Sequence, residues 1–123
     1  MKKLLIVATL IEWATGLVLL VYPPVMTRLL FREEITGAGI LISRIAAASL
    51  IALGVACWPS SNPLHAFYGM LTYNAIVMLY LAYVAIGHEA GILLWPAVAA
   101  HAVIAVLLFM AWWKQRKALE ASA

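Results

Sequence analysis

The sequence predicts an all-α protein, an integral membrane four-helix bundle with a short interfacial helix between its first and second membrane spans. Two observations lead to this prediction. Of the 123 residues, 67% are hydrophobic and 11% are charged, whereas soluble domains average about 25% charged residues. The apolar residues are gathered in four runs, each long enough to cross a hydrocarbon core about 30 Å thick. We therefore expect one transmembrane domain, residues 1–123.

The first span is expected at about residues 4–22, with Glu12 as its single charge. At about 1.5 Å per residue this run is about 28 Å long, which matches the hydrocarbon core. Its opening Met-Lys-Lys also resembles a secretory signal, but the apolar run continues past any cleavage point. Pro23 and Pro24 end the first helix and suit the first turn of another.

The segment 25–36 mixes apolar and charged side chains, and its apolar residues recur at helical spacing. This pattern is typical of a short helix that lies on the membrane surface. The next three spans are expected at about 39–57, 64–86 and 93–113. A five-residue connector joins the second span to the third, so these two helices should be antiparallel neighbours.

Positive charge indicates the orientation of the chain. Five lysines and arginines lie near the two termini, whereas the two arginines of the first loop are accompanied by two glutamates. Because positive flanks favour the cytoplasmic side, we expect both termini in the cytoplasm. The expected location is a bacterial-type inner (plasma) membrane. Tryptophans, which prefer the lipid–water interface, fall at the predicted span ends: Trp58, Trp95, Trp112 and Trp113.

The sequence carries no motif for chemistry on a water-soluble substrate, such as Gly-x-Ser-x-Gly, a Walker loop or a dinucleotide fingerprint. We expect no catalytic residues and no enzyme activity. No nucleic-acid partner is expected, because basic and aromatic residues do not interleave. No metal or cofactor is expected either. The single cysteine, Cys57, excludes a cysteine-built metal site, and His101 has no second histidine at its depth to hold a haem.

One strongly polar side chain lies in each predicted span. An ionised group at the centre of a membrane helix costs roughly 2.5 to 3.5 kcal/mol, so such residues usually face the bundle interior and find partners. Thr9 and Gly16, which share a helix face with Glu12, are small enough to let another helix approach. We therefore predict an intramembrane polar core formed by Glu12, Arg44, Asn74 and His101.

Two interpretations of the charged pair stay open. Depths counted along the helices place Glu12 and Arg44 within the reach of a guanidinium on its stem, which favours a buried ion pair. Alternatively, Arg44 snorkels to the outer interface and Glu12 is protonated, because burial disfavours a charged carboxylate.

Aromatic side chains near these residues are candidates for a cavity lining. Tyr73 and Tyr80 share a helix face, and Trp13 lies beside Glu12. Together they would suit an amphiphilic ligand. An aromatic stripe at helical spacing also arises from ordinary helix packing, and the sequence does not separate the two interpretations.

Two family resemblances follow from this pattern. A four-span chain with a lone glutamate midway along its first span resembles the small multidrug resistance transporters, and Leu-Ile-Glu-Trp-Ala-Thr-Gly at 10–16 is similar to the surroundings of their proton- and substrate-binding glutamate. The third span lacks the tryptophan and the glycine-rich motif with which that family builds its dimer. Over more of its length, through Ser43-Arg44-Ile45-Ala46, the chain resembles small DoxX-like bacterial membrane proteins, which implies a fold and no catalytic assignment.

We therefore predict an accessory or small-ligand-binding membrane subunit that acts through its buried polar core. The alternative is a proton-coupled transporter of small amphiphiles that acts as a homo-oligomer, with Glu12 binding the proton and the amphiphile in turn. A purely structural subunit of a larger membrane complex is the third candidate. In each case the lipid bilayer is the expected partner.

Overall fold

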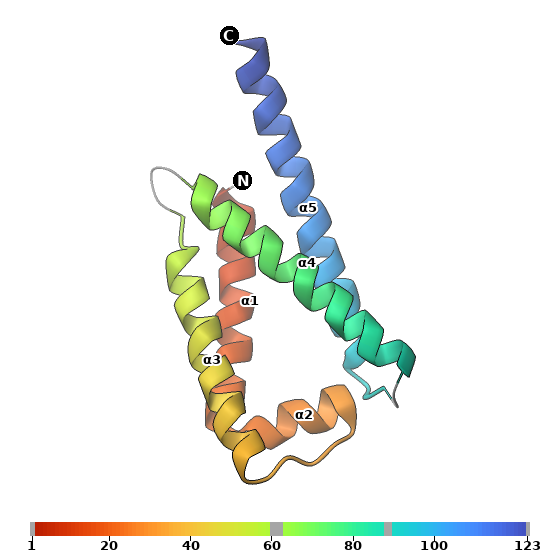
Figure 1. Ribbon diagram of the computed structural model, residues 1–123. Helices are drawn as coiled ribbons and strands as arrows, with labels where there is room; N and C mark the ends of the chain where they lie inside the picture. The colour runs from red at the N-terminus through yellow and green to blue at the C-terminus, as the bar shows by residue number, and fades with distance from the viewer. Residues whose placement is uncertain (1, 60–62, 88–89, 123) are drawn as a thin grey trace.

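The computed structural model describes residues 2–59, 63–87 and 90–122, and within these ranges the chain is all-helical. Both termini lie toward the same end of the molecule (Figure 1). Four helices of the described residues are long and apolar enough to cross a membrane, as predicted, and the short α2 is the exception. The helices are α1 (Lys2–Val21), α2 (Pro23–Phe31), α3 (Ala38–Ala56), α4 (Leu64–Gly87) and α5 (Leu94–Ala121).

The short helix α2 begins at the two prolines, as the sequence predicts. Proline suits this position because its φ is already helical and its missing N–H is not needed in the first turn. The helix ends at Phe31, earlier than the predicted segment 25–36, because Arg32 has a left-handed φ of 57°. A right-handed helix cannot continue through that conformation.

The last helix, α5, is longer than the predicted span 93–113 and continues to Ala121. Its 28 residues correspond to about 42 Å, against a hydrocarbon core of about 30 Å. The final turns therefore project beyond the other helices (Figure 1). They carry the charged residues Lys114, Arg116, Lys117 and Glu120.

The long helices pack chiefly in two pairs, α1 with α3 and α4 with α5. In the first pair, Gly54 lies against the indole of Trp13, where a Cβ would overlap the ring. The Trp13 Nε1 donates a hydrogen bond of 3.1 Å to the Ile51 carbonyl oxygen, and the Trp58 ring stacks on the same indole with 5.4 Å between ring centres. A small residue at Gly54 is what lets this ring cross the interface.

The two pairs meet in a buried cluster toward the end of the molecule that carries the termini. Residues from α1, α4 and α5 form most of it, together with the cysteine that follows α3. Its members are Leu5, Ala8, Cys57, Phe67, Met70, Ile104 and Leu108.

At the opposite end the two pairs diverge, and α2 crosses between them (Figure 1). The segment before α5 is fastened to α2 by two backbone hydrogen bonds. Gly91 N donates to Leu30 O at 2.9 Å, and Leu93 N donates to Leu29 O at 3.0 Å. A Cβ on Gly91 would overlap this backbone, so glycine permits the close approach. Helix α2 is thus held by the chain at its start and by hydrogen bonds near its end.

Candidate functional site

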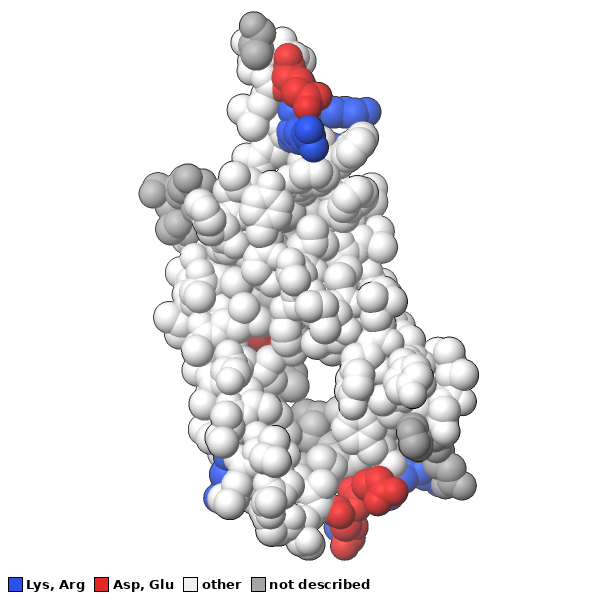
Figure 2. Space-filling view, in the orientation of Figure 1, with Lys and Arg blue, Asp and Glu red and all other residues white. Residues whose placement is uncertain are grey.

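The charged side chains gather at the two ends of the molecule, and the band between them is nearly uncharged (Figure 2). An opening between the two helix pairs is visible in this view, with a small acidic surface beside it. The acidic residue in the apolar part of the chain is Glu12, which is 1% exposed. A cavity of about 510 Å³ lies between α3 and α4 and is lined by Ala46, Ser49, Leu50, Leu53 and Tyr73.

Helix α1 presents Glu12 to α4, where the Tyr73 hydroxyl lies near the carboxyl group. The Oε1 atom of Glu12 has no hydrogen-bond partner among the described residues, and neither does the hydroxyl of Thr9 one turn earlier. Both side chains are buried. Each unsatisfied buried polar group costs about 1–3 kcal/mol, so two of them on one helix face require an explanation.

A second set of polar contacts joins α4 to α5. Asn74 Nδ2 donates to the Met70 carbonyl oxygen at 2.9 Å, and Asn74 Oδ1 lies 2.8 Å from His101 Nδ1. A carbonyl oxygen only accepts, so the amide nitrogen must face Met70 and the amide oxygen must face His101. His101 Nδ1 is therefore the donor of this bond, which leaves Nε2 as the acceptor of a neutral ring.

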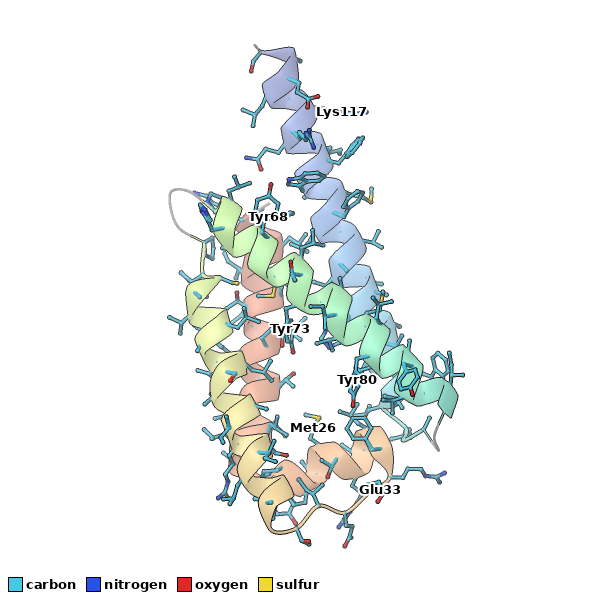
Figure 3. The ribbon with its side chains drawn as sticks, in the orientation of Figure 1. Met26, Glu33, Tyr68, Tyr73, Tyr80 and Lys117 are labelled. Atoms are coloured by element: carbon cyan, nitrogen blue, oxygen red, sulfur yellow. The ribbon has the colours of Figure 1, made fainter. Side chains whose placement is uncertain are left out.

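Tyr73 connects these contacts with the cavity. Its ring meets the His101 ring edge-on, with 6.0 Å between ring centres, and its side chain also lines the cavity beside α3. Figure 3 shows Tyr73 between the two helix pairs, with Met26 and Tyr80 nearer α2. We call Glu12, Tyr73, Asn74 and His101 the polar network; three of the four predicted polar-core residues belong to it.

Arg44, the fourth predicted polar-core residue, does not join the network. It is exposed on α3 and forms no ion pair with Glu12 in the part of the chain that the structure describes. The register of the helices is the reason. Trp13 bonds to Ile51, and Arg44 precedes Ile51 by seven residues, which is about 10 Å along the helix and beyond the reach of the guanidinium.

The three predicted cavity-lining aromatics are in different surroundings. Only Tyr73 is among the residues that line the cavity beside α3. Trp13 packs between α1 and α3, where its N–H is satisfied by Ile51. Tyr80 is 62% exposed and lies nearer α2 than Tyr73 does (Figure 3).

Two features of the site were not assigned from the sequence. The contact between Tyr73 and Glu12 was not predicted, because it depends on how α1 faces α4. Thr9 was noted as a small residue, and its unsatisfied hydroxyl was not foreseen. Its position three residues before Glu12 is the signal that places both on one face. Among the described residues, no three His, Cys, Asp or Glu side chains lie close enough to hold a metal ion.

Comparison of the chain with protein-family models, curated proteins and solved structures gave no match.

Proposed function

We propose that this protein is a four-span membrane protein, with both termini in the cytoplasm of a bacterial-type cell, that binds a small amphiphile at its polar network. The amphiphile enters from the bilayer between the two helix pairs. Its polar end bonds to Glu12, Thr9 and Tyr73, and its apolar part occupies the cavity beside α3. The protein then acts as a ligand-binding or accessory membrane subunit.

One observation supports this proposal above the others. The Oε1 atom of Glu12 is buried without a hydrogen-bond partner, and Tyr73, which contacts the same carboxyl group, also lines the cavity. A carboxyl group kept only for packing would be expected to have its bonds satisfied. An apolar cavity with a few convergent polar groups is the usual form of a small-molecule site.

The chemistry of the free atoms indicates the class of ligand. A carboxylate oxygen accepts hydrogen bonds, and a hydroxyl accepts them as well. A hydrogen-bond donor, in particular an alkylammonium group, therefore suits this site, since a bond between an ammonium and a carboxylate is about twice as strong as a neutral one.

Binding of dodecylamine, measured by equilibrium dialysis against the full chain in lipid nanodiscs, tests the proposal. Glu12→Gln keeps the shape of the side chain and removes its charge. We expect it to weaken binding tenfold or more, because hydrogen bonds to charged groups contribute about 1.5–3 kcal/mol. Tyr73→Phe should weaken binding less.

Glu33→Gln is the matched control, because it makes the same chemical change on the exposed connector after α2. We expect it to bind dodecylamine like the unmodified protein. Equal binding by Glu12→Gln and the unmodified protein would refute the proposal. So would equal affinity for dodecanol, which has the same chain without the ammonium group.

A proton-coupled transporter is the second candidate, favoured by the contact between a buried carboxyl and Tyr73 beside a cavity that opens between helices. It predicts uptake of dodecylamine into proteoliposomes driven by a pH gradient and abolished by Glu12→Gln. Binding without gradient-driven uptake would leave the binding-subunit proposal in place and reject transport.

A further inference from the structure

A second cavity, of about 390 Å³, lies at the end of the molecule that carries the termini. It is formed between the first turns of α4 and the part of α5 that follows the paired tryptophans. Its lining includes Leu64, Tyr68, Trp112, Gln115, Arg116 and Leu119. None of these residues belongs to the polar network, so the cavity is separate from the proposed ligand site.

Arg116 supplies a positive charge with free donors at this cavity. Its Nε donates to Glu120 at 3.1 Å, and its guanidinium carbon lies 5.5 Å from the centre of the Trp112 ring. The terminal Nη atoms make no hydrogen bond to the described residues. Two parallel donors on a planar guanidinium match the spacing of two phosphate oxygens.

Tyr68 adds a second donor. The Trp112 Nε1 donates to the Tyr68 hydroxyl oxygen at 3.1 Å, so the tyrosine is the acceptor in that bond and its own hydrogen is left for another partner. Gln115 contributes an amide to the same lining. The start of α4 also carries the positive end of its helix dipole, which favours an anion nearby.

The position of the cavity indicates that its anion belongs to a lipid. Trp112 and Trp113 stand where the apolar part of α5 ends, just before Lys114, and indoles prefer the lipid–water interface. The walls of the cavity include the apolar Leu64 and Leu119. The Lys117 ammonium lies 5.4 Å from the centre of the Trp113 ring, on the same projecting end of α5. Figure 3 shows Tyr68 and Lys117 at this end of the molecule.

We propose that this cavity binds the phosphate of an anionic phospholipid. The Arg116 guanidinium and the Tyr68 hydroxyl contact the phosphate oxygens. The acyl chains lie along the apolar part of α4 and α5, which leads away from the end that carries the termini. Basic pockets between helices at a membrane surface are a recognised type of site for lipid headgroups. Glu120, the one carboxylate beside Arg116 among the described residues, opposes the anion and competes for the guanidinium.

Native mass spectrometry of the full chain, titrated with phosphatidylglycerol, tests this proposal. Hydrogen bonds to charged groups contribute about 1.5–3 kcal/mol, so Arg116→Gln should weaken binding of the first lipid tenfold or more. Lys114→Gln removes the same charge outside the cavity, so it loses only the general attraction of a basic residue for anionic lipid, roughly 1 kcal/mol, and should weaken binding about fivefold or less. Glu120→Gln should strengthen binding, a gain that a misfolded variant cannot give.

Three results would overturn the proposal. Equal losses in Arg116→Gln and Lys114→Gln would show general surface attraction in place of a site. Equal affinity for phosphatidylcholine would show that the cavity does not select anionic lipid. Displacement of the lipid by millimolar inorganic phosphate would show a site for the free anion.

Discussion

The two ends of this helix bundle are built from similar apolar residues, but they pack in different ways. Toward the termini, α1, α4 and α5 meet around Phe67, Leu5 and Leu108, which are fully buried. Toward the other end the two helix pairs separate, and α2 with its backbone hydrogen bonds is what joins them. The end near the termini is therefore closed by side-chain packing, and the other end is open; in the proposed function, the open end is where the amphiphile enters.

Truncation of a buried side chain at the closed end should have the largest effect on the free energy of unfolding. Phe67 is 0% exposed and lies within the buried cluster, so Phe67→Ala should lower the free energy of unfolding by about 3–5 kcal/mol. Unfolding in mixed micelles, followed by circular dichroism, measures this loss. Met26→Ala is the matched truncation at the open end and should cost less than about 1 kcal/mol. A similar loss in both variants would mean that the two ends are equally packed.

Substitution of the glycine that fastens α2 should have an intermediate effect. A Cβ on Gly91 overlaps the Leu29 and Leu30 backbone, so Gly91→Ala should release α2 at a cost of about 1–3 kcal/mol. Hydrogen exchange of residues 23–31 should then become faster, while exchange around Phe67 stays slow. Gly87→Ala is the control, because a Cβ there meets nothing within 4 Å. Unchanged exchange in Gly91→Ala would show that α2 is held by other contacts.

Removal of the exposed ion pair between Arg28 and Glu34 should have the smallest effect on stability. Arg28 Nη2 and Glu34 Oε1 lie 2.6 Å apart, with side chains 60% and 74% exposed. Exposed pairs of this kind contribute about 0.2–1 kcal/mol, so Glu34→Gln should lower stability by less than about 1 kcal/mol. Even that loss should shrink in high salt. A salt-independent loss above 2 kcal/mol would indicate a structural role for the connector.

The sequence predicted those parts of the fold that depend on one segment at a time. Apolar runs located the four long helices, and Pro23 and Pro24 located the start of α2, because length, hydropathy and a missing N–H act locally. The early end of α2 at Arg32 was not predicted, since a left-handed φ at a non-glycine residue leaves no clear pattern in the sequence.

Features that depend on the relative position of two segments were harder to predict. Whether Glu12 pairs with Arg44 depends on the register between α1 and α3, which the sequence does not specify. An error of a few residues in each predicted depth was enough to predict a contact that the two side chains do not make. Asn74 and His101 were placed in one core and do bond to each other. The facing of Tyr73 to Glu12 follows from how α4 crosses α1, which no single helix specifies.

The way α2 is held has a consequence for ligand size. Because this helix starts where α1 ends and is bonded to the segment that leads into α5, its nine residues act as a spacer about 13 Å long between the two helix pairs. The width of the opening between the pairs is therefore set by the length of α2. For the proposed amphiphile site, adding or removing one helical turn in α2 would change which ligands enter, with every side chain of the polar network left as it is.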